Sequence, residues 1–177
     1  MYERRIARSA AADHSMQMLR DRARRRQIGL LLISLFLVLL LPSARAGADG
    51  VELVVVVHPN NSTQSLSTAE LAAIFTTQRR HWSGSKSIIA LNLPPRSEHR
   101  ALFDRAVLAM DPDAVARFWI DRKVRGGAAP PRQVPDATMA VRVVAKLEAA
   151  IGYAPREGAD KSVRVVARIR GGKVVAP

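Results

Sequence analysis

The sequence predicts an α/β fold in which a mixed, mainly parallel sheet is flanked by helices and closed by a C-terminal hairpin. The first observation is the β-branched run Val51–Val57, which is too short for a buried helix and is followed by Pro59. The second is that helical patterns then alternate with short apolar runs. The third is Gly171-Gly172, a two-residue turn between two short strands. A near-continuous apolar strand is typical of parallel sheets that helices cover on both faces.

Capping residues predict where four helices begin. Ser67 and Glu70 have the spacing of a capping box, so a helix starts at the residue after Ser67. Ser97, Asp111 and Asp136 are the N-caps of three more helices, and the proline after Asp111 suits a first helical position. The side chains expected to face the core are Leu71, Ile74 and Phe75 in the first helix, Leu102, Phe103, Ala106, Val107 and Met110 in the second, Val115, Phe118 and Trp119 in the third, and Val141, Val144 and Leu147 in the fourth.

Short apolar runs predict the remaining strands. The second strand is Ile88–Leu91, and Ile151–Tyr153 follows the last helix. In Val163–Ile169 every second residue is apolar, and Arg164, Val166 and Arg168 stand between them, which suits an edge strand with one face in water. Lys173–Val175 is the second arm of the C-terminal hairpin. The sequence therefore predicts five strands in one small domain.

The N-terminal residues 1–46 have the order of a secretory signal peptide. Five arginines between Arg20 and Arg26 precede the apolar run 28–41, and Ala44 and Ala46 supply the small side chains of a cleavage site after Ala46. The apolar run has 14 residues, whereas a membrane-spanning helix needs about 20. We therefore expect export to the periplasm and a mature domain at 47–177. The alternative is an uncleaved signal anchor, which would keep the protein at the membrane.

The composition limits the partners of the mature domain. Residues 47–177 carry 19 basic and 12 acidic side chains, a formal excess of +7, which favours anionic partners. Export to the periplasm argues against nucleic acid. The chain has no cysteine, so no disulfide and no lipid-anchored cysteine are expected. The natural start is Met1, Met16 or Met18, because the segment before the apolar run is long for a signal.

Several motifs in this order resemble the phosphate-binding proteins of ABC importers. The matching pieces lie within about Val54–Pro155 and are Leu66-Ser67 to Ile74-Phe75, Trp82-Ser83-Gly84, Arg96-Ser97 to Phe103, Phe118-Trp119, Gly126-Gly127 to Pro130-Pro131, and Ile151-Gly152-Tyr153. The resemblance implies a type II periplasmic-binding-protein fold, which normally has two lobes around a ligand cleft. This chain resembles the second lobe only. The partners implied are phosphate or a similar small anion, and an ABC permease or envelope protein.

The resemblance also implies an anion site at the start of the second helix. In the family this helix opens with an arginine and a Ser-Gly-Thr turn that holds phosphate. Here Arg96, Ser97 and Arg100 occupy the segment, but the glycine and threonine are absent and Glu98 adds a carboxylate. A helix N-terminus attracts anions, and the arginines would add charge-assisted contacts. The alternative is a plain serine cap with Arg100, Asp104 and Arg105 facing solvent.

A second group of candidate ligand residues follows the first strand. Asn60, Asn61 and Ser62 lie at its carboxyl end, the edge at which open α/β sheets usually receive ligands. We expect them to complete the anion site. The alternative is an Asx turn in which these side chains satisfy their own backbone.

The sequence gives little support for enzymatic chemistry. His58, His81 and His99 lack the spacing of metal ligands, and no nucleophile motif is present, so no catalytic residue, metal or cofactor is expected. Arg79, Arg80 and His81 beside Trp82 read as solvated charges next to a core aromatic residue. The leading hypothesis is a periplasmic binding protein for phosphate or another oxyanion. The alternative is a non-enzymatic periplasmic interaction module that has lost its small ligand.

Overall fold

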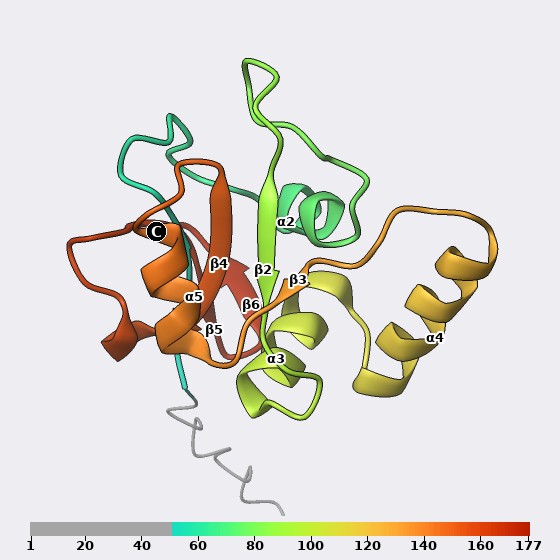
Figure 1. The fold of residues 1–177 in the computed structure, drawn as a ribbon. Helices are drawn as coiled ribbons and strands as arrows, with labels where there is room; N and C mark the ends of the chain where they lie inside the picture. Colours follow the sequence, from blue (N-terminus) through green and yellow to red (C-terminus); the bar gives the residue numbers. More distant parts are fainter. Residues whose placement is uncertain (1–50) are drawn as a thin grey trace, which may run out of the picture. The chain divides into compact units, whose positions relative to one another are not determined.

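The computed structural model describes residues 51–177, so the predicted signal segment and its cleavage site lie outside the described residues. Six strands form one sheet in the order β3-β2-β4-β1-β5-β6 (Figure 1). The elements in chain order are β1 (Leu53–Val57), α2 (Thr68–Phe75), β2 (Ile89–Asn92), α3 (Glu98–Phe103), the π-helical turn η1 (Asp104–Leu108), α4 (Pro112–Val124), β3 (Arg132–Gln133), α5 (Ala137–Val144), β4 (Ala150–Pro155), the short helix η2 (Arg156–Gly158), β5 (Arg164–Arg170) and β6 (Lys173–Val175).

The strand directions confirm a mixed sheet but not a mainly parallel one. β2 runs parallel to β3 and β4. β1 is antiparallel to both of its neighbours, β4 and β5, and β5 is antiparallel to β6. The five residues of β1 are fully buried, as predicted. The apolar run of β1 therefore indicates only that both faces of the strand are covered. This is true of parallel strands and of central antiparallel strands, so the run does not indicate the direction of the neighbouring strands.

The last strands also differ from the prediction in one respect. β5 is not an edge strand, because β6 pairs along its outer side from Arg168↔Val175 to Arg170↔Lys173. The predicted hairpin is present, and Gly171 and Gly172 have φ values of 56° and 73°, which a two-residue type I′ turn requires. The alternating pattern of β5 was produced by arginines at the sheet surface rather than by an open edge.

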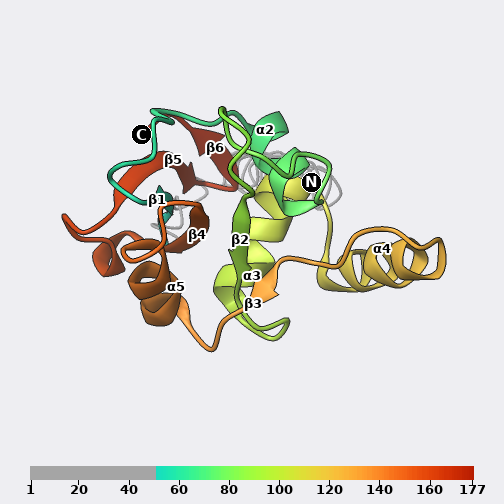
Figure 2. The same ribbon diagram turned by 45° about the horizontal axis from the view of Figure 1, so that its top comes forward.

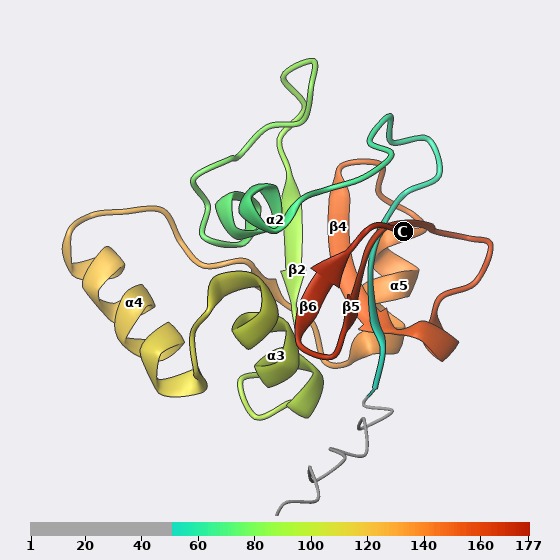
Figure 3. The ribbon, with the colours of Figure 1, turned by 180° about the vertical axis from the view of Figure 1, so that it is seen from behind.

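Helices cover the two faces of the sheet. On one face of β4, Gly152 lies under α5, where an added Cβ would meet Val144 at 3.4 Å and Ala140 at 3.6 Å. On the opposite face, Tyr153 stacks on Phe103 of α3 with ring centroids 4.0 Å apart. Consecutive strand residues point to opposite faces, so α5 and α3 lie on opposite sides. α5 is accordingly in front of the sheet in Figure 1 and behind it in Figure 3.

The aromatic cluster behind the sheet fixes the end of β2. Phe75 lies 4.5 Å from Phe103 and 6.0 Å from Tyr153, measured between ring centroids. The Tyr153 hydroxyl donates to Oδ1 of Asn92 at 2.6 Å, and the Leu93 amide donates to the same oxygen at 3.0 Å. Burial raises the pKa of Tyr153 well above its usual value. The carboxyl end of β2 is thus anchored by buried packing and a buried hydrogen-bond network.

α4 stands apart from the sheet (Figures 1 and 2). Within this helix only Val115 is buried; Phe118 and Trp119 are half-buried, and Ile120 and Val124 are 64% and 81% exposed. Of the three core positions predicted for α5, Leu147 is wrong: the helix ends at Val144, and Leu147 beyond it is 42% exposed. None of the helices described between residues 51 and 177 has both the length and the apolarity needed to cross a lipid bilayer.

Candidate anion-binding site

The segment after β2 builds the predicted helix start. The Ser97 amide donates to the Pro94 carbonyl at 2.9 Å, and the Ser97 hydroxyl accepts from the Arg100 amide at 3.4 Å. Ser97 is therefore the N-cap of α3, as predicted, and its hydroxyl keeps its own O–H available to donate to a ligand. Arg96, the residue before the cap, is exposed. The first amides of a helix lack partners within the helix, so this start offers N–H donors beside one serine and one free arginine.

Arg100 does not face solvent, so the alternative in which it is a solvated charge is wrong for this residue. Its Nε donates to Oδ2 of Asp104 at 3.1 Å, and its Nη1 donates to the Leu93 carbonyl at 2.8 Å. The side chains of Arg100 and Asp104 are only 11% and 3% exposed. The physical reason is that Asp104 is buried where α3 passes into η1, and a buried carboxylate needs a paired charge, so Arg100 folds onto it instead of extending into solvent. Arg105 remains exposed, as predicted.

Asp104 keeps one unsatisfied oxygen. Its Oδ1 is buried and has no hydrogen-bond partner in the structure. Burial raises the pKa of this carboxyl group, while the charge and hydrogen bond of Arg100 oppose the rise. An unpaired buried acceptor costs free energy until a donor reaches it. A ligand or water that carries a hydrogen-bond donor would therefore be favoured next to this oxygen.

A pocket of about 410 Å³ opens directly beside this ion pair. Arg100, Asp104 and Gln133 supply its polar groups. Its apolar walls come from α4, from Pro95 and from the loop before β3; the lining residues are Pro95, Pro112, Val115, Ala116, Trp119, Pro130 and Pro131. The pocket lies beside β3 and next to the segment that follows the carboxyl end of β2.

Asn60, Asn61 and Ser62 do not join this site. They follow the carboxyl end of β1, and β1 is antiparallel to β4 while β2 is parallel to β4. The carboxyl ends of β1 and β2 therefore point to opposite ends of the sheet along the strand direction. Figure 1 shows the loop after β1 at the far end from α3. The expectation that the two groups form one site is wrong, because it assumed that the strands run in the same direction.

The side chains of this second group are already engaged. Oδ1 of Asn61 accepts from the Thr63 amide at 2.9 Å, which is the predicted Asx turn. Nδ2 of Asn61 donates to the Glu148 carbonyl at 3.3 Å, and Asn60 donates to the Glu148 side chain at 3.4 Å. Ser62 is exposed and lines a hollow of only about 150 Å³ with Glu148 and Lys86.

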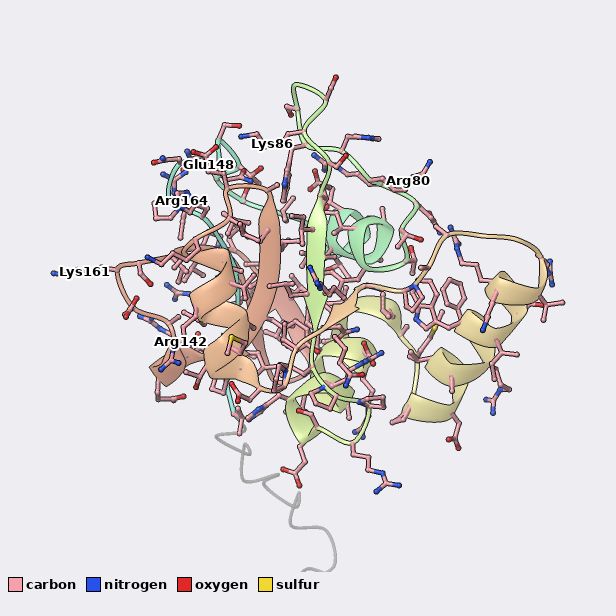
Figure 4. All side chains as sticks on the ribbon, viewed as in Figure 1. Arg80, Lys86, Arg142, Glu148, Lys161 and Arg164 are labelled. Atoms are coloured by element: carbon pink, nitrogen blue, oxygen red, sulfur yellow. The ribbon has the colours of Figure 1, made fainter. Side chains whose placement is uncertain are left out.

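Electrostatics also disfavours an anion at this second location. The Glu148 side chain accepts from Lys86 Nζ at 2.6 Å. This hydrogen bond, that from Asn60 and the charge of Lys86 hold the pKa of Glu148 below its usual value. A carboxylate thus stays ionised at the mouth of the hollow and would repel a bound anion. Figure 4 shows Lys86, Glu148 and Arg164 at this end of the molecule.

Sequence reasoning missed most residues of the pocket. The four-residue spacing of Arg100 and Asp104 indicates a helical ion pair, but the same spacing is common on exposed helix faces. Trp119 and Gln133 come from α4 and β3, and no local pattern places these elements beside α3. In residues 51–177 no group of three or more histidine, aspartate or glutamate side chains has a geometry that could hold a metal ion.

The fold itself can be compared with solved structures. It resembles that of phosphate receptors. An ABC-type phosphate transport receptor from Vibrio cholerae matches with a TM-score of 0.53 and 19% identity, covering 66% of this chain and 46% of that one. A phosphate ABC transporter substrate-binding protein from Clostridium perfringens, with bound phosphate, matches with a TM-score of 0.51 and 18% identity, covering 66% of this chain and 45% of that one. PstS from Borrelia burgdorferi matches with a TM-score of 0.51 and 14% identity, covering 66% and 47%.

The match agrees with the predicted α/β fold, although the sheet is mixed rather than mainly parallel. This chain spans less than half the length of the three receptors that it matches. No family model and no curated protein matches it. The α/β fold with a six-stranded mixed sheet therefore resembles part of the fold of these receptors.

Proposed function

We propose that this protein is an exported, non-enzymatic binding protein that recognises phosphate or a similar oxyanion at the start of α3. The observation that carries the proposal is the position of the helix start. Ser97, the first amides of α3 and the free Arg96 lie at the carboxyl end of β2, in a fold shared with phosphate receptors. The excess of basic residues in 47–177 favours an anionic ligand in the same way.

Each group would have a distinct task. The Ser97 hydroxyl and the first amides of α3 would donate to the oxyanion, and the dipole of the helix would favour its charge. Arg96 would add a charge-assisted contact. Arg100 would act as a positioning residue, because its bonds to the Leu93 carbonyl and Asp104 tie the first turn of α3 to the end of β2.

The predicted signal segment supports a periplasmic location. In that compartment we propose that the protein delivers or presents its anion to an ABC permease or another envelope protein. The described residues offer donors from one side of a ligand, so we expect them to bind it more weakly than a closed two-lobe receptor would. A membrane partner would compensate by covering the open side of the site.

Calorimetry with inorganic phosphate tests the proposal. Ser97→Asp keeps an effective N-cap but places a carboxylate at the site, so we expect normal stability and loss of phosphate binding. Ser67→Asp is the matched control, because it adds the same charge at the cap of α2. Arg96→Gln should weaken binding about tenfold or more, whereas Arg105→Gln on the same helical segment should not.

A flat titration of well-folded protein with millimolar phosphate, sulfate and related anions would overturn the proposal. The chain would then be better described as a periplasmic interaction module. Equal weakening by Ser67→Asp and Ser97→Asp would also count against it, because the anion would then respond only to overall charge.

A further inference from the structure

A second pocket is separate from α3 and has a basic lining. Its volume is about 490 Å³, and it lies between the end of α2, the outer side of β2 and the loop that returns from α4 to β3. Figure 2 shows this loop running back alongside β2. Its charged or titratable lining residues are Arg79, Arg80, His81 and Arg132, and none of its lining residues is acidic.

The backbone holds the basic residues of α2's exit firmly. The amides of Gln78 and Arg79 both donate to the Ala73 carbonyl at 2.8 Å, and the Ile88 amide donates to the Arg80 carbonyl at 2.8 Å. His81 forms an isolated bridge with Ser87. The segment is thus tied both to α2 and to the entry of β2, which limits the entropy lost when a ligand binds.

The fourth basic residue comes from the opposite wall. Arg132 is in β3, and its backbone pairs with Leu91 of β2. Two regions more than fifty residues apart therefore place arginines around one pocket. Of these, Arg79 is partly neutralised: its Nη1 lies 3.2 Å from Oε1 of Glu70, and its guanidinium lies 5.9 Å from the centre of the Trp82 ring.

Arg80 and Arg132 differ from Arg79 in this respect. In the part of the chain that the structure describes, neither has a carboxylate within salt-bridge distance. Guanidinium groups recognise phosphate and carboxylate groups through paired hydrogen bonds. Two arginines without partners at one pocket therefore offer more donors than the protein itself uses.

Thr77 adds an unused polar atom to the same lining. Its Oγ1 is buried and has no hydrogen-bond partner. Thr77 also has a positive φ of 59°, which is uncommon for a β-branched residue. A ligand oxygen would satisfy this hydroxyl, which otherwise remains an uncompensated buried group.

The size and the remaining walls narrow the ligand class. A volume of about 490 Å³ falls in the range of pockets for small organic molecules and exceeds the needs of a free phosphate ion. Ile74, Ile88, Ala128 and Pro130 supply apolar surface beside the arginines. We propose that this pocket, here called the Arg80/Arg132 pocket, binds a phosphate monoester or diester, with the phosphate group on the arginines and the organic part on the apolar wall.

Soluble esters and lipid head groups share this chemistry, so the experiment includes both. Protein produced from the complete coding sequence is titrated by calorimetry with glycerol 3-phosphate and with inorganic phosphate. It is also mixed with vesicles of phosphatidylcholine alone or with added phosphatidylglycerol. We expect saturable binding of the soluble ester, or of the phosphatidylglycerol vesicles, and binding of either one identifies the source.

Matched variants test the location. Arg80→Gln with Arg132→Gln should weaken binding about tenfold or more. Arg142→Gln with Lys161→Gln removes the same charge on the α5 side, away from Arg80 in Figure 4, and should change binding by less than about twofold. Thr77→Val keeps the side-chain shape and should produce a smaller loss. Ser97→Asp should leave this binding unchanged, so the result is independent of the site proposed at α3.

Two results would overturn the inference. One is the absence of binding to any of these probes by folded protein. The other is equal weakening by the pocket pair and the control pair, which would show that the probes respond only to net charge.

Discussion

The carboxyl ends of β1 and β2 point to opposite ends of the sheet, and a different kind of polar cluster lies at each. At the end of β2, Arg100 and Asp104 form a buried ion pair, with side chains 11% and 3% exposed, below a pocket of about 410 Å³. At the end of β1, Lys86 and Glu148 form an open pair, 55% and 48% exposed, beside a hollow of about 150 Å³. The segment after β2 thus leads to a pocket, whereas the segment after β1 forms a turn whose side chains are already hydrogen-bonded.

The difference shows that a polar cluster can bind a ligand when buried groups support it and some of its donors remain unpaired. At the β1 end, Asn60 and Asn61 already use their amides to bind Glu148 and the neighbouring backbone. At the β2 end, buried groups hold the helix start rigidly, and the exposed Arg96 remains free. Rigid support behind free donors is the arrangement that binding requires.

The sharpest way to break this comparison is to remove one partner from each ion pair. Arg100→Met should lower the free energy of unfolding by about 3 kcal/mol or more, because it leaves Asp104 buried without a compensating charge. Urea unfolding of wild type and variant measures the difference. A loss no larger than that of Lys86→Met would contradict the structural role given to Arg100.

The pH dependence of stability should have opposite signs at the two ends. Burial raises the pKa of Asp104 from its usual 3.8, so stability falls as the pH rises from 3.8 through the raised value. Hydrogen bonds lower the pKa of Glu148 from its usual 4.5, so its contribution is present above pH 4.5 and is lost as the pH falls through the lowered value.

Two single variants separate these slopes. Asp104→Asn should remove the loss of stability on raising the pH, and Glu148→Gln should remove the loss on lowering it. Denaturant unfolding in steps from about pH 3 to about pH 7 would measure both. If the free energy of unfolding changed with pH in the same direction in both variants, the two ends would not differ as described.

The smallest expected effect is at the exposed pair. Lys86→Met should change the unfolding midpoint much less than Arg100→Met, because water and salt screen exposed charges. The same variant measured in low and in high salt provides the check. A destabilisation that matches Arg100→Met would mean that the β1 end is as tightly organised as the β2 end.

Local chemistry made the helix starts predictable. The capping box is formed as expected: the Ser67 hydroxyl accepts from the Glu70 amide at 3.3 Å, and the Ser67 amide donates to the Glu70 carboxylate at 2.9 Å. Asp111 and Asp136 accept from the amides three residues later, at 2.7 Å and 2.8 Å. These interactions span three residues, so a linear sequence contains all the information that they need.

Long-range pairing made the rest of the site unpredictable. β1 precedes β4 by almost a hundred residues, and nothing in its valine run specifies an antiparallel partner. Because β1 runs antiparallel to β4, its carboxyl end with Asn60, Asn61 and Ser62 lies far from Ser97. The burial of Asp104 likewise depends on packing against distant segments, because the four-residue spacing of Arg100 and Asp104 is equally compatible with an exposed helical ion pair.

The most direct test of the central claim is a phosphate titration followed by amide nuclear magnetic resonance. The account predicts saturable shifts of the Ser97, Glu98 and His99 amides, with those of Asn60 and Asn61 unchanged. Ser97→Asp should abolish the shifts at α3. Saturable shifts confined to the loop after β1, or no shifts in folded protein at millimolar phosphate, would contradict it.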